Sequence, residues 1–208
     1  MAHGEPPPID SPGEGTARGR IVAAARRHFF AHGLRGVTMD DLAAELGMSK
    51  KTLYAHFPGK AALVEAVVHE KFRQLEAEVA AIASDRSDFL TALHRLLACL
   101  QRQSAEVQPT FLRDLQREAP ELLKWGEARR REVIQRYFGQ LLAEGRRQGL
   151  IRKDVPVHLV IEVLLGAVQA ILNPPKLAEL GLTPKAALSA VLTVVLEGAI
   201  SPKGRPER

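Results

Sequence analysis

The sequence predicts an all-helical protein, and three observations lead to that prediction. Apolar residues make up 46% of the 208 residues and aromatic residues only 5%, so the interior must be built mainly from Leu, Val, Ile and Ala. Apolar residues recur at three- and four-residue spacing along most of the chain, as on one face of a helix. No stretch of useful length alternates apolar and polar residues as a strand does, and no repeat at solenoid spacing occurs.

The first helix is expected from Ala17 to His32. Gly33 follows it directly and is a typical helix stop. Residues 1–16 are rich in Pro, Gly and acidic residues, which cannot bury enough apolar surface to offset the entropy of ordering, so we expect a disordered tail. The apolar residues that recur at helical spacing in this helix are Ile21, Ala24, Ala25 and Phe29.

Two short helices joined by a tight turn are expected next. Thr38 precedes "MDDLAAELG" with Asp41 three residues on, which is the spacing of a capping box. Gly47 can take the left-handed conformation that ends the second helix, and Ser49 can cap the third helix through its hydroxyl. Pro58 disfavours helical geometry at the residue before it, so the third helix should end after about two turns.

The rest of the chain is expected to form longer amphipathic helices, which makes about nine helices in all. A fourth helix starts near Gly59 and runs to Ile82. Pro174 and Pro175 are expected to break the chain before the last helix. The helices expected after Ile82 cover Phe89 to Gln103, Pro109 to Glu118, Glu121 to Gln148, Val157 to Asn173 and the segment after Thr183.

The outer face of the third helix carries the first functional signal. Leu53 and Phe57, four residues apart, should pin its inner face, and no carboxylate lies between Glu45 and Glu65. An anion is therefore the expected partner. A helix about 10 to 12 Å wide fits the major groove of B-form DNA, although a polar stretch of this kind can also be only a solvated face. The outer residues, all able to donate hydrogen bonds, are Lys50, Lys51, Thr52, Tyr54 and His56.

The stretch "GVTMDDLAAELGMSKKTLYAHFPGKAALVEAV", which starts at Gly36, resembles the DNA-binding segment of TetR-type bacterial transcriptional regulators. The segment "FFAHG" extends the resemblance back to about Arg20, and the remaining two thirds of the chain match the family only in being helical and of suitable length. The resemblance implies an N-terminal three-helix helix-turn-helix DNA-binding domain and a C-terminal helical domain for ligand binding and dimerisation. The implied ranges are 17–82 for the DNA-binding domain with its connecting fourth helix, 83–201 for the effector-binding and dimerisation domain, and 202–208 for a C-terminal tail.

The resemblance also implies roles at single positions. Thr38 falls where the family caps its second helix and contacts phosphate, and Lys60 falls where the fourth helix begins beside a phosphate. Lys51 stands where a small residue such as glycine is frequent, and His28 stands where an apolar residue is frequent, so base preference could differ. The implied base-reading residues are Lys50, Lys51 and Thr52, and the implied phosphate-gripping residues of the third helix are Tyr54 and His56. The full predicted DNA-binding set is Thr38, Ser49, Lys50, Lys51, Thr52, Tyr54, His56 and Lys60.

The net charge, the single cysteine and the histidines indicate which partners and bound groups to expect. The net charge of +5 suits a polyanionic partner. Cys99 is the only cysteine, which excludes an intramolecular disulfide, and it is expected to be a small buried residue. His28 and His32 share a helix face but lack a third ligand, so no metal is expected.

No glycine-rich phosphate loop, serine elbow or carboxylate pair indicates an enzyme or a cofactor. A helical-bundle enzyme fused to a DNA-binding domain remains as the alternative from that class. The N-terminus lacks the apolar core of a signal peptide, which favours a cytoplasmic protein.

The last two predicted helices are apolar on nearly every face. The helix from Val157 to Asn173 contains Glu162 and is shorter than the about 20 apolar residues that span a bilayer, so no membrane partner is expected. Burial against both the chain's own core and a second copy explains this composition. In the TetR family the last two helices pair with those of a second subunit as a four-helix bundle, and the resemblance implies a homodimer here. The predicted interface residues are Val160, Leu164, Val168, Leu192 and Val194.

The central helices could line an inducer cavity or fill an ordinary core. The run Arg129 to Arg131 is expected to be a solvated face rather than an anion site. We interpret the sequence as that of a repressor that binds a palindromic operator in double-stranded DNA and is released by a small, largely apolar effector. The alternative is a regulator without an inducer. The predicted effector-binding residues are Phe89, Leu93, His94, Leu96, Phe111, Leu115, Trp125 and Tyr137.

Overall fold

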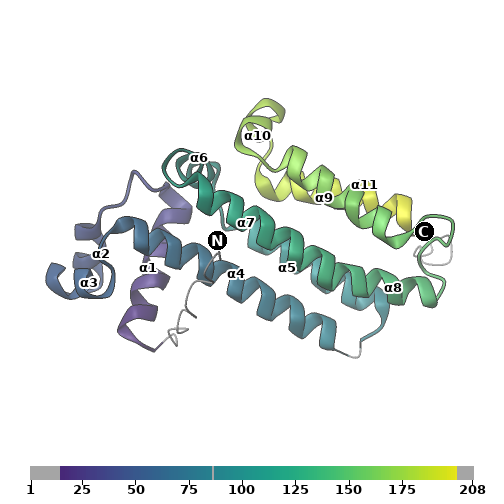
Figure 1. The fold of residues 1–208 in the computed structure, drawn as a ribbon, viewed down its shortest axis with the longest axis horizontal. Coiled ribbons are helices and arrows are strands. Elements are labelled where there is room, and N and C mark those ends of the chain that lie inside the picture. The colour runs from purple at the N-terminus through teal and green to yellow at the C-terminus, as the bar shows by residue number, and fades with distance from the viewer. Residues whose placement is uncertain (1–14, 86, 201–208) are drawn as a thin grey trace, which may run out of the picture.

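A computed structural model describes residues 15–85 and 87–200 of the protein, and within them the predicted all-helical fold is confirmed. Figure 1 shows a small unit of α1, α2 and α3 at one end, from which the long α4 leads into a bundle whose outer layer is α9 and α11. The elements are α1 (Ala17–His32), α2 (Met39–Glu45), α3 (Lys50–His56), α4 (Lys60–Ser84), α5 (Phe89–Ala105), α6 (Pro109–Glu118), α7 (Pro120–Val133), η1 (Ile134–Phe138), α8 (Gly139–Arg147), α9 (Val157–Ile171), α10 (Pro174–Leu180) and α11 (Pro184–Ala199).

The first four helices follow the sequence signals closely. Thr38 and Asp41 form the capping box in both directions, and Ser49 accepts from the backbone N–H of Thr52 at 3.1 Å. Gly47 has a φ of 60°, the left-handed value that ends α2 after Leu46. The expected tails lie outside the described residues, apart from Gly15 and Thr16. Thr16 caps α1 by accepting from the backbone N–H of Gly19 at 3.0 Å.

Two later elements differ from the prediction. Pro174 and Pro175 begin the short helix α10 instead of only breaking the chain, because Asn173 caps it and proline is well suited to the first helical turn. The predicted helix from Glu121 to Gln148 is continuous from α7 to α8 but contains the π-helical turn η1. We find no local sequence signal for this turn.

The described residues form two hydrophobic cores joined by α4. The first core holds the buried residues of α1, α2, α3 and the start of α4, together with Phe111 and Leu115 from α6. The second core holds the rest of α4 with α5, α7, η1, α8, α9 and α11. The side chain of Phe72, midway along α4, packs against both cores. Since α6 belongs to the first core, the cores do not divide the chain at residue 82, and the predicted domain ranges stay a prediction.

One close helix contact shapes the far end of the second core. The ring of Phe89 at the start of α5 occupies the space that a Cβ at Gly145 of α8 would need. Only glycine therefore lets α5 and α8 approach so closely. Among the described helices, none is by itself long and apolar enough to cross a membrane; the pair α9 and α10 passes that test only together and is bent by 80°.

Candidate DNA-binding surface and effector cavities

The inner residues of α3 fix which side of the helix faces solvent. Leu53 and Phe57 are buried in the first core, at 0% and 1% exposure. This leaves the opposite face open, as the sequence predicted. The predicted α3 residues Lys50, Lys51, Thr52 and Tyr54 and the cap Ser49 are exposed, and His56 is half-buried.

The polar groups on this face differ in how they are already engaged. Lys50 Nζ donates to Asp40 Oδ2 at 2.5 Å, and this hydrogen bond raises the pKa of Lys50 above its usual value. Lys51 forms no ion pair with any described residue, and the Tyr54 hydroxyl forms no hydrogen bond to one. The Ser49 and Thr52 hydroxyls are 2.8 Å apart. Lys51 and Tyr54 are therefore ready to meet a partner, whereas Lys50 must first leave Asp40.

Thr38 and Lys60 are held by neighbours inside the chain. The Thr38 hydroxyl donates to Asp41 Oδ2 at 2.7 Å, and that hydrogen bond lowers the pKa of Asp41. Lys60 Nζ donates to the carbonyl of Leu34 and lies 6.0 Å from the ring centroid of Phe29. Lys60 thus ties the start of α4 to the segment between α1 and α2, a contact that the sequence did not indicate.

The structure also shows residues of α1 that hold α2 and α3 in place, which the sequence did not indicate. Arg18 donates to the carbonyl of His56 at 2.9 Å and lies 4.2 Å above the Phe57 ring, so it holds the end of α3. Arg27 donates to Glu45 of α2 at 2.7 Å, and His28 also pairs with Glu45. The His28 contact is the main cause of the lowered pKa of Glu45. These pairs fix α2 on α1, and they are too distant in sequence to show as a local signal.

The predicted effector-binding residues do not meet in one cavity. Three line a cavity of about 320 Å³ between α4, α5 and α8, where the Ser87 hydroxyl is buried without a hydrogen-bond partner among the described residues. Leu93 is buried in the second core, and His94 is exposed and points away from a core because its helix buries the opposite face. The cavity residues are Phe89, Leu96 and Tyr137; Phe111 and Leu115 lie in the first core, and Trp125 packs at its edge.

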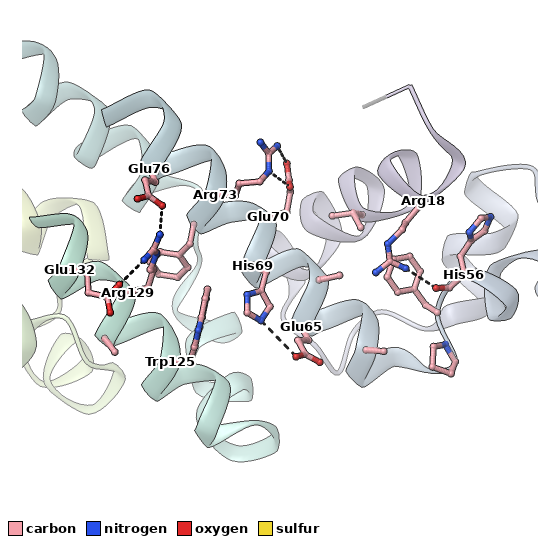
Figure 2. Close-up of a pocket in the computed structure, with 17 residues that line it drawn as sticks. Arg18, His56, Glu65, His69, Glu70, Arg73, Glu76, Trp125, Arg129 and Glu132 are labelled. Atoms are coloured by element: carbon pink, nitrogen blue, oxygen red, sulfur yellow. Dashed lines mark hydrogen bonds and ion pairs between the residues drawn. The ribbon is translucent and has the colours of Figure 1, made fainter. Parts of the chain in front are cut away.

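Trp125 lines a second and larger hollow, a cleft of about 720 Å³ where α1 and the end of α3 face α4 and α7. Figure 2 shows Trp125 against His69, with ring centroids 4.0 Å apart. Arg129 reaches both Glu76 and Glu132 at one end of the cleft. Most of the charged groups here already have partners, so the aromatic wall is what remains open to a ligand.

The predicted interface residues need a correction. Val160, Leu164, Val168 and Leu192 are buried in the second core, where α8, α9 and α11 pack together, so their side chains are enclosed within one chain. Only Val194, at 73% exposure, is open to a partner. The large apolar side chains that α9 exposes are one position away, Leu159 at 49% and Val163 at 52%.

Cys99 is buried, as expected for a small core residue. Burial, together with a hydrogen bond to Glu78, raises the pKa of the thiol to about 12. A thiol with this pKa is almost wholly protonated near neutral pH and is therefore a poor nucleophile.

The similarity to known protein sequences is concentrated in the N-terminal helices. Residues 21–67 match the family described as "Bacterial regulatory proteins, tetR family". The chain is 44% identical over 63 residues to the uncharacterized HTH-type transcriptional regulator YvaF of Bacillus subtilis, an alignment that covers 29% of this chain and 33% of that relative. The chain matches about a third of the length of this curated relative.

The fold as a whole is similar to solved repressors. The structure of SmeT, the repressor of the Stenotrophomonas maltophilia multidrug efflux pump SmeDEF, aligns with a TM-score of 0.63 at 19% identity and covers 92% of this chain and 94% of SmeT. A SmeT–triclosan complex aligns with a TM-score of 0.61 at 20% identity, covering 92% and 97% of the two chains. At such low identity this likeness concerns the fold.

Proposed function

Because residues 21–67 match the TetR family of bacterial regulators, we propose that the chain is a TetR-type transcriptional repressor that binds a palindromic operator as a homodimer and is released by a small, largely apolar effector. Its proposed place of work is the cytoplasm, where it would meet DNA. The relatives named above are transcriptional regulators, and we propose no enzymatic activity.

The exposed donor face of α3 is the observation that carries the proposal. The helix is short, capped by Ser49 and held by Leu53 and Phe57, so it protrudes as a rigid rod. A rod of this width enters the major groove with its outer side chains against base edges and phosphates. We assign base reading to Lys50, Lys51 and Thr52, and phosphate contacts to Tyr54 and His56. Thr38, Ser49 and Lys60 complete the proposed DNA-binding set.

Dimerisation is proposed through the outer face of α9 and α11. Leu159 and Val163 of α9 and Val194 of α11 are exposed apolar side chains. Figure 1 shows these two helices as the outer layer of the bundle. Apolar side chains of this size gain free energy when a second copy covers them. Two copies would present two α3 helices, which is what a palindromic operator requires.

An effector could act through contacts that join the bundle to the DNA-binding unit. Asp114 of α6 accepts from the backbone N–H of Leu34 at 2.8 Å. Lys71 of α4 donates to the carbonyl of Gln103 in α5 at 2.8 Å, and its neighbour Glu106 pairs with Arg26 of α1. A ligand that moves α5 or α6 would therefore change the position of α1 and, with it, α3. The cavity beside Tyr137 and the cleft beside Trp125 are the proposed places for such a ligand.

The test is selection of bound duplexes from random DNA, followed by measurement of variants on selected and random duplexes. Lys51→Ala should lose sequence preference, because a good bidentate base contact is worth about 1 to 3 kcal/mol of discrimination. Tyr54→Phe should weaken binding to all duplexes alike, since phosphate contacts read no sequence. Lys153→Ala, an exposed lysine far from α3, is the matched control and should bind as the unaltered protein does.

Failure to enrich any sequence would contradict the proposal, and so would equal behaviour of Lys51→Ala and Tyr54→Phe on both kinds of duplex. For the effector, triclosan and other apolar molecules serve as probes of operator release. Trp125→Ala should reduce the release while leaving DNA affinity unchanged in the absence of the probe. If no apolar probe changes operator affinity, the regulator without an inducer becomes the better proposal.

A further inference from the structure

The run Arg129 to Arg131 holds three neighbouring arginines in different surroundings. Arg129 pairs with Glu76 and, at 2.6 Å, with Glu132, and Arg131 pairs with Glu162 at 2.7 Å. Arg130 lies between them and is partly buried, and its guanidinium forms no hydrogen bond or ion pair with any residue in 15–85 or 87–200. Two members of the run are therefore satisfied within the chain, and the middle one is not.

Leaving Arg130 in this state costs free energy. A guanidinium does not lose its proton in proteins, so burial removes water from a full positive charge. Burial lowers the pKa of Arg130, and the negative charge of Glu127 on the same helix opposes this only through space. An anion that accepted hydrogen bonds from Arg130 would remove this cost.

Arg130 lines a cleft of about 300 Å³ between α7 and α9. Its α7 wall also carries Lys124, which pairs with Glu121, together with Arg131 and the carboxylate of Glu127. Leu165 and Leu172 form the apolar part of the wall on the side of α9. The volume lies at the small end of the range for ligand pockets, about 300 to 1,000 Å³. The chemistry of the two walls suits a small molecule with one anionic end and a short hydrocarbon end.

The backbone next to Arg130 departs from regular α-helix. The N–H of Ile134, where the π-turn η1 begins, bonds to the carbonyls of both Arg130 and Arg131. Such π-turns inside α-helices occur often at functional sites. Figure 1 shows α9 alongside the helix formed by α7 and α8, and α9 packs on η1 and α8, so the cleft lies where α9 passes α7.

We propose that the cleft between α7 and α9 is a binding site for a small amphipathic carboxylate, whose anionic group pairs with Arg130 and whose hydrocarbon chain lies against Leu165 and Leu172. This site is separate from the cavity at Tyr137 and from the cleft at Trp125. Its effect on operator affinity rests on the proposed function, but binding itself does not.

The experiment is calorimetric titration of the full-length protein with octanoate in the absence of DNA, so that it does not depend on DNA binding. Octanoate should bind, and Arg130→Gln should weaken it about tenfold or more, the loss expected for a charged hydrogen bond. Arg117→Gln is the matched control, because Arg117 is an exposed arginine of α6 that lines neither this cleft nor the cavities at Tyr137 and Trp125; it should keep octanoate affinity. Octanol, with the same chain and no charge, should bind about tenfold more weakly or worse.

A shortened series of carboxylates tests the apolar wall, since each methylene that is buried should change affinity about fourfold. The thermal unfolding midpoint of Arg130→Gln without octanoate should equal or exceed that of the unaltered protein, because no partner is lost. Equal binding of octanoate by Arg130→Gln, equal binding of octanol, or a response to inorganic phosphate alone would overturn the proposal. Loss of dimerisation in Arg130→Gln would also overturn it, since a carboxylate of the second copy would then be the partner of Arg130.

Discussion

The two ends of the molecule differ in how completely a single chain satisfies them. Around α1, α2 and α3 each helix begins at a capping side chain, and Glu45 is paired with Arg27 and His28. Around α7, α9 and α11 the same chain leaves Val163 and Val194 exposed and Arg130 without a partner among the described residues. At the first end only the polar face of α3, with Lys51 and Tyr54, is left open to a partner, whereas at the second end both apolar side chains and a partly buried charge are left without one.

The largest expected effect on stability comes from removing one buried phenylalanine ring from each core. Phe57 in the first core and Phe138 in the second are both 1% exposed. Each change to alanine should lower the free energy of unfolding by about 3 to 5 kcal/mol. Because α4 belongs to both cores, we expect a single unfolding transition in urea. Circular dichroism and the fluorescence of Trp125 should both report this transition at the same urea concentration. Two separate transitions in Phe57→Ala would show that the DNA-binding unit unfolds alone and would break the comparison at α4.

The next effect concerns the surface that we assign to a second copy. Val163 is exposed and Leu164, its neighbour on α9, is 1% exposed. Val163→Glu should weaken dimerisation about a hundredfold, which corresponds to about 3 kcal/mol, because an unpaired carboxylate would be buried between subunits. Leu164→Glu should instead destabilise the folded chain itself. Sedimentation velocity and thermal unfolding separate the two outcomes, and a stable dimer of Val163→Glu would remove this interface from consideration.

The same two ends differ in how well the sequence predicts them. The bounds of α2 and α3, the capping box at Thr38 and the left-handed Gly47 follow from signals within a few residues. So does the exposed face of α3, since Leu53 and Phe57 are its main apolar anchors. Local chemistry decides these features, and the sequence contains all of it.

The inward face of α9 could not be predicted in the same way. This helix is apolar around most of its circumference, so periodicity does not tell Leu164 from Val163. Packing against η1, α8 and α11 decides which of them is enclosed. The pairs of Glu45 and the isolation of Arg130 likewise depend on residues distant in sequence. The eight predicted effector-binding residues lie in different places because such distant contacts decide their surroundings. Phe111 and Leu115, for example, lie on α6, which packs with α1 in the first core.

Lys71 provides a pH-dependent test at the junction of the two ends. Burial lowers its pKa to about 8, although Glu106 opposes the shift. The unfolded chain, with an ordinary lysine pKa near 10.4, then binds more protons than the folded chain between about pH 8 and pH 10. Stability should therefore rise with pH in this window, by about 2 kcal/mol from this group.

The measurement is urea unfolding of the unaltered protein and of Lys71→Met between pH 7 and pH 10. Below about pH 8, the difference in free energy of unfolding between the two proteins should change little with pH. Above pH 8, the unaltered protein should become more stable relative to Lys71→Met. Lys51→Met, which changes an exposed lysine, is the control and should show no such trend. A difference that stays constant up to pH 10 would mean that Lys71 keeps an ordinary pKa in the folded chain.

The smallest effect compares the same capping chemistry at the two ends. Thr38 accepts from the backbone N–H of Asp41 at 3.1 Å and Thr183 from that of Ala186 at 3.2 Å. Either change to alanine should lower the free energy of unfolding by about 1 kcal/mol. Only Thr38→Ala should also weaken operator binding and let the pKa of Asp41, which the Thr38 hydroxyl lowers, return toward its usual value in an NMR titration. Equal operator affinity in the two variants would limit Thr38 to its capping role and leave the DNA contact to α3 alone.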